Sequence, residues 1–419
     1  ATANTANTKA GNAVTTANSA NTKADNAVAT ANTANTKAGN AVTTANSANT
    51  KADNAVATAN TANTKAGNAV TTANIVELNS LEHSFGSATH IKSARFVIGT
   101  SVSGWTAKDC DYLCDGTEDQ VEINAAIQAL PADGGEVVIL DGTYNIAAKI
   151  DINKNNVSLR GNGNATILKR MWNDDAINGV ITLSNVSGCG VVCLQVDGNK
   201  TTHISSKNCG IYLYSSNNNN NIASNTCNNN GNSGIYLAYS DNNNIASNVC
   251  DNNNGFYGIR LFYSSKNNIA SNTCNNNHFS GICLSVGSDN IITGNICNNN
   301  NSGIELSHCS ASVITSNICN NNIDCGIYTS NSNNNTITGN TCNNNNSGIY
   351  LYFSRNNAIT SNTCIRLNGA SASYSTSQYT IRLIYTDNCY NLISSNNCMG
   401  KAVVIEGGTS NTEVNNKWE

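Results

Sequence analysis

Residues 222–237 read IASNTCNNNGNSGIYL, and the same phrase returns at an almost constant spacing as far as residue 364. Its cysteine and the glycine that opens Gly-Ile-x-Leu both recur every 22 to 24 residues. The cysteines of the repeat are Cys227, Cys250, Cys274, Cys297, Cys319, Cys342 and Cys364. A fixed period in this range indicates one supersecondary unit that stacks on copies of itself.

Each repeat predicts three short strands separated by turns. Ile222 begins the first strand, Thr226 and Cys227 form the second, and residues 235–237 form the third. Alternation along the third strand directs Ile235 and Leu237 inward and Tyr236 outward. Because 22 to 24 residues complete a circuit without a helix, successive copies can pair only in parallel. The predicted fold class is therefore all-β, a single-stranded parallel β-helix.

Two columns of the repeat have a structural interpretation. Asparagine stands two residues before each repeat cysteine, and stacked amides can hydrogen-bond along the axis of the β-helix. These residues are Asn225, Asn248, Asn272, Asn295, Asn317, Asn340 and Asn362. The cysteines are predicted to be small buried hydrophobic residues, since adjacent rungs rarely offer the dihedral angle of a disulfide. Asn and Gly at the turns tolerate a positive φ.

Residues 1–74 form a second repeat, in which 28-residue blocks place alanines at alternating steps of three and four. This heptad pattern predicts a helical coiled-coil stalk over residues 1–85, and close packing of two or three parallel chains would support its small Ala core. A disordered low-complexity spacer is the alternative. Larger side chains would clamp the end of the stalk, namely Ile75, Val76, Leu78, Leu81 and Phe85. Residues 86–118 are predicted to be a connector containing a strand at 94–98.

Residues 119–130 predict a short amphipathic helix that caps the β-helix, with Val121, Ile127 and Leu130 on its inner face. Gly134-Gly135, an apolar strand at 136–140 and Gly142-Thr-Tyr144 follow it. This opening resembles that of the pectate-lyase-like superfamily of right-handed parallel β-helices. The later repeats resemble the parallel β-helix repeats of the same superfamily, which also occur in phage tail fibres and tailspikes. The resemblance covers about residues 109–415 and implies a β-helix domain over 119–419.

When the repeats are aligned, the residue between Ile and Leu of Gly-Ile-x-Leu varies from one repeat to the next. We refer to this aligned position as the outward column. Aromatic rings beside charged groups suit a sugar chain, so six members are candidate carbohydrate-binding residues: Tyr212, Tyr236, Arg260, Glu305, Tyr328 and Tyr350. Cys283 and, after a longer circuit, Arg382 belong to the same column. The alternatives are tyrosines that stack only on each other and a face that packs against another chain.

Catalysis by a single chain has weaker support. Hydrolysis of a glycosidic bond needs two carboxyl groups ~5 to 9.5 Å apart, and acids are sparse in the repeats. Glu305 and Asp324 are the candidate catalytic residues, while the neighbours Asp174 and Asp175 would point to opposite faces of a strand. Whether the protein is an enzyme stays open at this point. If it is one, the resemblance implies a polysaccharide lyase or a glycoside hydrolase.

Composition limits the possible partners. The net charge is −4, 11% of residues are charged, and no basic block is present, which argues against nucleic-acid binding. The sequence contains no run of eighteen or more apolar residues, so it does not predict a helix that inserts into a membrane. The 17 cysteines lack the histidine partners of a zinc site, so no metal or other cofactor is predicted.

An Ala-heptad stalk followed by a β-helix resembles bacteriophage tail fibres and tailspikes, or bacterial surface adhesins built in the same way. The resemblance implies a structural and receptor-binding fibre or spike protein. It also implies a homotrimer that binds a cell-surface polysaccharide through the side of the β-helix, on a virion tail or on a cell surface. The alternatives are a tailspike-type polysaccharide-degrading enzyme and a secreted or surface-layer β-helix repeat protein.

Overall fold

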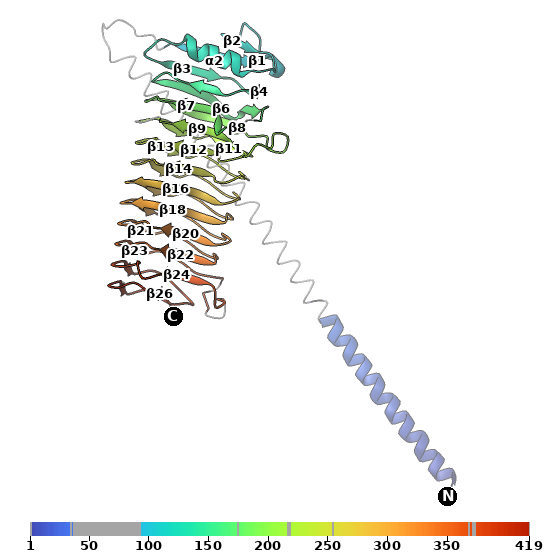
Figure 1. The fold of residues 1–419 in the computed structure, drawn as a ribbon. Coiled ribbons are helices and arrows are strands. Elements are labelled where there is room, and N and C mark those ends of the chain that lie inside the picture. Colours follow the sequence, from blue (N-terminus) through green and yellow to red (C-terminus); the bar gives the residue numbers. More distant parts are fainter. Residues whose placement is uncertain are drawn as a thin grey trace, which may run out of the picture. The chain divides into compact units, whose positions relative to one another are not determined.

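The computed structural model describes residues 2–33, 36, 94–173, 176–215, 219–253, 255–367, 369–370 and 374–418. The chain divides into two units, residues 1–91 and 92–419, which are treated separately below. Figure 1 shows a helical segment in the first unit and a column of stacked strands in the second.

The first unit contains a helix over residues 2–33, so helix is confirmed for this part of the predicted stalk. All of its residues are exposed, including Val14 and Val28. Threonine hydroxyls, such as those of Thr8 and Thr22, donate hydrogen bonds to the carbonyl four residues earlier. Since Thr and Asn form helices poorly, packing against other chains would be the main source of stability. The coiled coil stays a prediction, and residues 75–85 lie outside the described residues.

The second unit is a right-handed parallel β-helix, as the repeat and the resemblance to the pectate-lyase-like superfamily together predicted. Its strands form two sheets in the described residues, and every pairing is parallel. Sheet A contains β1 (Arg95–Thr100), β2 (Tyr112–Cys114), β3 (Gly135–Ile139), β4 (Gly142–Ile146), β6 (Val157–Arg170), β8 (Gly190–Asp197), β10 (Asn221–Ala223), β11 (Thr226–Asn228), β13 (Asn244–Ala246), β15 (Asn268–Ala270), β17 (Ile291–Thr293), β19 (Val313–Thr315), β21 (Thr336–Thr338), β23 (Ala358–Thr360), β25 (Leu392–Ser394) and β27 (Thr412–Val414).

Sheet B carries the outward column of the sequence repeat. It contains β5 (Ile150–Ile152), β7 (Asn178–Ser184), β9 (Asn208–Tyr214), β12 (Ile235–Ala238), β14 (Ile259–Phe262), β16 (Ser280–Ser288), β18 (Ser302–Ser310), β20 (Cys325–Ser330), β22 (Ser347–Tyr352), β24 (Tyr379–Ile384) and β26 (Val404–Glu406). Successive strands of each sheet lie next to one another along the column in Figure 1.

Successive repeats align residue on residue. Ile222 pairs with Ile245, and Leu237 pairs with Leu261. The inward isoleucines, leucines and repeat cysteines form one continuous buried core. All 17 cysteines are free thiols, and the seven repeat cysteines are buried, as predicted. The rungs therefore stack through a regular apolar core rather than through disulfides.

Three asparagine ladders run along the β-helix, where the sequence reasoning anticipated one. In the predicted ladder, Asn272 Nδ2 donates to Asn295 Oδ1 at 3.0 Å and to the carbonyl of Ile245 at 2.8 Å. A second ladder follows Asn230, Asn253, Asn277, Asn300, Asn322 and Asn345. A third follows Asn220, Asn243, Asn267 and Asn290, then Ser312, Asn335, Asn357, Asn391 and Asn411. Buried turn amides are thereby hydrogen-bonded from rung to rung.

The glycine of Gly-Ile-x-Leu serves close packing of rungs rather than a turn with positive φ. At Gly258 a Cβ would come within 2.6 Å of the carbonyl oxygen of Gly281 and 2.8 Å of Cys274 Cβ. Neither glycine has a positive φ. Turn positions with positive φ are instead filled by residues such as Ser271 and Asn276. The glycine recurs because a side chain at this point would separate adjacent rungs.

The predicted capping helix is present as α2 (Gln120–Ala129). The prediction for Val121 was wrong, because this side chain is 54% exposed while Ile123, Ala126 and Ile127 are buried. The two oxygens of the Asp119 carboxylate accept backbone N–H groups at 2.8 and 2.6 Å, from residues 116 and 145. This attachment fixes the start of α2 to β4 and rotates the helix so that Ile123 faces the core. A 3-10 turn, η1 (Ser101–Ser103), follows β1.

Candidate functional site

The outward column of sheet B lies in strict register, so the residues predicted to form one face do form one. Strand pairing aligns Tyr212 with Tyr236 and then Arg260. It continues through Cys283, Glu305, Tyr328, Tyr350 and Arg382. Adjacent members lie ~4.8 Å apart, the spacing of neighbouring strands. We call this surface the sheet B face.

Members of the column differ in how accessible they are. Tyr236 is only 4% exposed, because its ring stacks on that of Tyr212 with centroids 5.2 Å apart and lies under the Arg260 guanidinium. Tyr212, Tyr328 and Tyr350 are partly exposed. Tyr236 therefore supports the face from below, and a ligand would meet its neighbours first. Burial raises the pKa of Tyr236, so its hydroxyl stays protonated.

Arg260 occupies the centre of an aromatic cluster. Its guanidinium carbon lies 4.9 Å from the ring centroid of Tyr236, 5.4 Å from that of Tyr257 and 5.6 Å from that of Phe262. Cation–π contacts of this kind hold a guanidinium in place without neutralising its charge. The residue is partly exposed.

Exposed aromatic residues border the column at the ends of the sheet B strands. Tyr239 and Tyr263 are 46% and 49% exposed, and their rings stack with centroids 5.4 Å apart. Both have a positive φ, +52° and +47°. Tyr214 meets the Tyr239 ring edge-on at 6.1 Å. An aromatic residue pays a conformational penalty in this backbone region, so the stack is built at some cost to stability.

A second stack repeats this arrangement nearer the carboxyl end. Phe353 and Tyr385 have φ of +48° and +79°, and their rings stack with centroids 4.8 Å apart. Four rungs, or ~19 Å, separate Tyr263 from Phe353 along the axis. We call these two groups the aromatic stacks. The same turn position carries Ser215, Val286, His308 and Asn331 in other rungs, all with a positive φ.

Sequence reasoning missed the aromatic stacks, although a signal was present. The residue two places after Leu in Gly-Ile-x-Leu is Tyr239 in one repeat and Tyr263 in the next. Aromatic residues are uncommon where a chain must adopt a positive φ, so the residue type gives no indication of a turn at this position.

A further aromatic group lies at the opposite ends of the sheet B strands. Phe256 stacks on Phe279 with centroids 5.5 Å apart, and Tyr257 lies 5.9 Å from Phe279. These residues precede β14 and β16, whereas Tyr239 and Tyr263 follow β12 and β14. The partly exposed Arg260 thus has aromatic residues on both sides along the strand direction.

The two candidate catalytic carboxylates lie on adjacent rungs of sheet B. Glu305 lies in the sheet B face, where its carboxylate accepts a hydrogen bond from the Ser280 hydroxyl at 2.8 Å. Asp324 precedes β20 and is exposed. Glu305 pairs with Tyr328, so the backbone position of Asp324 lies four residues earlier along the next rung. Both carboxylates raise the pKa of the buried Cys325 thiol, after the larger effect of burial. Asp174 and Asp175 lie outside the described residues.

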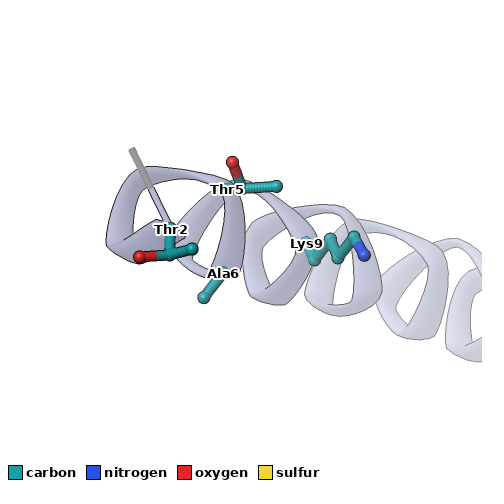
Figure 2. A pocket seen from close by; sticks show the side chains of 4 residues that line it. All are labelled: Thr2, Thr5, Ala6 and Lys9. Atoms are coloured by element: carbon teal, nitrogen blue, oxygen red, sulfur yellow. The ribbon is translucent and has the colours of Figure 1, made fainter.

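Two surface depressions lie away from the sheet B face. One is a shallow dent on the helix 2–33, lined by Thr2, Thr5, Ala6 and Lys9 (Figure 2). The other is lined by the first residues of β10, β13 and β15 and by residues just before them: Asn219, Asn220, Asn221, Asn242, Asn243, Asn244, Lys266 and Asn268. The first includes Ala6, a core position of the predicted heptad, so a partner helix would cover it. Neither depression gathers groups suited to catalysis.

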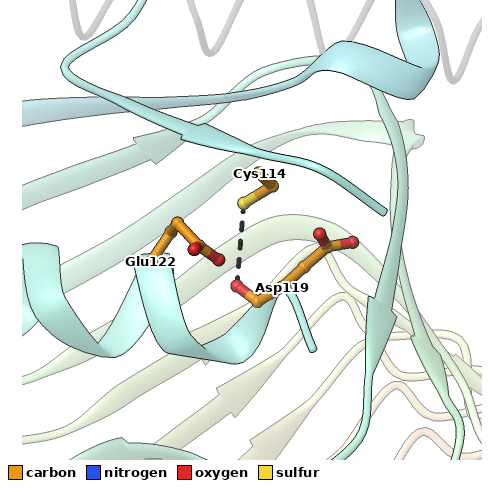
Figure 3. A group of neighbouring side chains, drawn as sticks. All are labelled: Cys114, Asp119 and Glu122. Atoms are coloured by element: carbon orange, nitrogen blue, oxygen red, sulfur yellow. Dashed lines mark hydrogen bonds between the residues drawn. The ribbon is translucent and has the colours of Figure 1, made fainter. Parts of the chain in front are cut away.

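One group of potential metal ligands occurs among the described residues, at the start of α2. It comprises Cys114, Asp119 and Glu122, whose ligand atoms lie within 4.8 Å of one another (Figure 3). The Cys114 thiol donates a hydrogen bond to the Asp119 carbonyl at 3.6 Å, and burial raises its pKa. Both carboxylate oxygens of Asp119 are occupied by backbone donors. A protonated thiol and an engaged carboxylate without an imidazole do not fit a transition metal.

No helix in the described part of the chain is long and apolar enough to cross a membrane. The predicted homotrimer, the bound glycan and the location on a virion or cell surface stay predictions, because the structure contains one chain.

Solved structures with the same fold include enzymes and a spike protein. The A-module of the Azotobacter vinelandii mannuronan C-5 epimerase AlgE4 superposes with a TM-score of 0.59 at 19% identity, covering 76% of this chain and 95% of that module. The Dettilon tailspike protein superposes with a TM-score of 0.53 at 18% identity, covering 70% of this chain and 66% of the tailspike. At these identities the likeness concerns the fold alone.

Sequence comparison identifies the family. No curated protein matches the sequence. The model of the family described as periplasmic copper-binding protein (NosD) matches residues 146–328 and 257–419, which together span most of the β-helix. The β-helix repeats that it matches are those whose register is described above, and the chain therefore belongs to the NosD family.

Proposed function

We propose that this chain is a structural and receptor-binding fibre or spike protein that recognises a cell-surface glycan through the sheet B face. The observation that carries the proposal is the pairing of the two exposed aromatic stacks with the aligned outward column. Stacked rings offer flat apolar surfaces to the C–H faces of sugars, and the Arg and Glu between them offer hydrogen bonds to hydroxyl groups. The ~19 Å between the stacks suits an extended chain rather than a single small molecule.

The conformational cost of the stacks supports a functional role. Asn331 fills the same turn position in another rung at φ +48°, and asparagine tolerates this conformation well. Four rungs nevertheless use Tyr or Phe there, at Tyr239, Tyr263, Phe353 and Tyr385. Strained residues of this kind gather at functional sites. Stacking between the rings recovers part of the cost, and ligand contact would account for the rest.

Copper binding is not part of the proposal. The family name refers to copper, and copper prefers thiolate, thioether or imidazole ligands. The group at Cys114 does not supply them, as shown above. Burial raises the pKa of the repeat thiols Cys227 and Cys274, whereas at Cys250 burial is outweighed by hydrogen bonds from these two thiols, which lower its pKa to about 6.

The helix 2–33 supports the second part of the proposal, a homotrimeric stalk. It exposes all its side chains, and its composition is too weak in helix formers to favour an isolated helix. We place the assembled protein on a virion tail or at a cell surface. Light scattering of the full chain should give three times the mass of one chain, and removal of residues 1–85 should lower it. A monomer at every concentration would contradict the stalk.

Binding to an array of bacterial surface polysaccharides tests the glycan role. The double variant Y239N/Y263N removes one aromatic stack and inserts the residue that the turn already uses at Asn331. We expect at least a tenfold loss of affinity for the polysaccharide that binds. The matched control is Y390N, because Tyr390 is 63% exposed with φ +58° but lies outside both stacks. Equal losses in both variants, or no binding by the unchanged protein, would contradict the proposal.

A further inference from the structure

Arg260 differs from every other described arginine in lacking a polar partner. Within the described residues its guanidinium makes neither an ion pair nor a hydrogen bond; its Nε is buried without a partner, as is the Nε of Arg382. The other arginines are each matched by a carboxylate or a carbonyl: Arg95 and Arg160 by Glu136, Arg170 by Gly198, Arg355 by Asp387, Arg366 by Asn345 and Arg382 by Glu406.

The comparison with Arg382 is informative because it stands in the same column. Its guanidinium also lies over rings, 5.7 Å from the Tyr350 centroid and 4.2 Å from that of Tyr379. Its charge is balanced by Glu406, with Nη2 to carboxylate oxygen at 2.8 Å. The aromatic surroundings of Arg260 are similar, but no carboxylate in the described part of the chain balances it. A positive charge is therefore held rigidly at the sheet B face with its hydrogen-bonding capacity unused.

The nearest acid in the column is arranged so that it does not neutralise Arg260. Strand register places the small Cys283 between Arg260 and Glu305, so the two charged residues are two rungs, ~10 Å, apart. The Glu305 carboxylate is also held by the Ser280 hydroxyl. The face therefore presents separate positive and negative points.

We infer that Arg260 is an oxyanion-binding site that makes the sheet B face selective for acidic polysaccharides. A carboxylate or a sulfate ester on a sugar ring would lie against the guanidinium, which suits two parallel hydrogen bonds to such a group. Glu305 would accept a hydroxyl of the same or the next sugar, and the surrounding rings would contact its C–H faces. This inference rests on the proposed function, because it names the class of glycan that the same face binds.

The test compares ligands and variants in parallel. The full chain is tested by surface plasmon resonance against uronic-acid polymers, sulfated polymers and neutral polymers. The variants are R260Q, R260K and the control R355Q. R355Q also removes one positive charge, but from a residue that pairs with Asp387 and lies in the turn between β22 and β23. The bound uronate polymer is also tested after chemical reduction of its carboxyl groups to alcohols. Thermal unfolding of each variant establishes that it is folded.

We expect preferential binding of acidic polymers, at least a tenfold loss in R260Q, a smaller loss in R260K and less than a twofold change in R355Q. Carboxyl reduction of the polymer should weaken binding to the unchanged protein but add little in R260Q. Loss with sulfated polymers alone would identify the sulfate ester as the oxyanion. If the unchanged protein binds neutral polymers and R260Q binds them equally well, this inference is overturned while the proposed function stands. Failure of every polymer to bind would overturn both.

Discussion

The rings of Tyr239 and Tyr263 stack with centroids 5.4 Å apart and planes 19° apart, although both residues have a left-handed backbone conformation. The two residues follow equivalent strands, β12 and β14, so the stack is a direct product of the repeat. Rungs ~4.8 Å apart set side chains of the same column at a spacing at which flat rings can stack. A repeat that aligns its core thus also aligns any aromatic residues placed at its turns.

Replacing both tyrosines with asparagine should leave the β-helix almost as stable as before. Relief of the backbone penalty, about 1 kcal/mol for each of the two residues, outweighs the loss of their ring stack, about 1 kcal/mol. In urea denaturation, we expect the free energy of unfolding of Y239N/Y263N to differ from that of the unchanged protein by no more than about 1 kcal/mol. A loss of several kcal/mol would mean that the rings serve the fold, and would remove the argument from conformational cost.

The asparagine ladder should be far more sensitive to substitution. N272A removes the acceptor of the Asn248 backbone N–H and Nδ2, and it removes the donor to the Ile245 carbonyl and to Asn295 Oδ1. Because each buried unsatisfied group costs about 1 to 3 kcal/mol, we expect a loss of at least ~3 kcal/mol in chemical denaturation. N244A is the control, since Asn244 belongs to a partly exposed row with Asn221 and Asn268. Equal effects of the two changes would contradict the structural role of the buried ladder.

Asp251 predicts a dependence of stability on pH. Burial raises the pKa of this carboxyl group from 3.8 to about 6, although it accepts a hydrogen bond from the Asn275 N–H at 2.6 Å. A raised pKa in the folded state means that the stabilising contribution is complete below pH ~4 and is lost as the pH rises through ~6. D251N should therefore gain stability relative to the unchanged protein over that window, by the order of 1 kcal/mol after allowance for partial exposure.

Unfolding curves at pH 4, 6 and 8 measure this difference. D289N is the control, because Asp289 is exposed at a turn and its replacement should change stability by less than about 0.5 kcal/mol at each pH. A constant difference between D251N and the unchanged protein across the pH range would contradict the assignment to Asp251.

Thiol labelling should separate the cysteines into two groups. Cys110, Cys193 and Cys389 are partly exposed, and the others are buried. Hydrogen bonds from Thr409 lower the pKa of Cys389, which raises its thiolate fraction and hence its reactivity. With a maleimide in native buffer we expect Cys389 to react first and Cys274 to react only after unfolding. Rapid labelling of the repeat cysteines would contradict a closed core. Mass spectrometry of peptides distinguishes these outcomes.

Much of the β-helix could be predicted because the repeat itself is the fold. The period defined the rungs, and the alternation in residues 235–237 defined which side chains face inward. The Ile, Asn and Cys columns continued to Ile393, Asn396 and Cys398 across a longer circuit, and strand pairing aligns Ile393 with Ile359. The rotation of α2 could not be read from a short helix, because tertiary hydrogen bonds to Asp119 set it.

The candidate face was predicted in its outline but not in its accessible parts. Column positions gave the alignment of Arg260 with Tyr236, which follows from strand register. The burial of Tyr236 depends on how the side chains of Tyr212 and Arg260 lie over it. The aligned sequence does not contain that information. The aromatic stacks were missed because they occupy turns whose backbone usually selects Asn or Gly.

The most direct test of glycan recognition by the sheet B face is protection of individual tyrosines when the polysaccharide binds. Hydroxyl-radical footprinting of the full chain, read by mass spectrometry, measures Tyr239, Tyr263, Tyr385 and Tyr390 in one experiment. We expect lower modification of Tyr239, Tyr263 and Tyr385 in the presence of the polysaccharide, with Tyr390 unchanged. Protection confined to Tyr390, or unchanged modification of all four at saturating polysaccharide, would contradict recognition through this face.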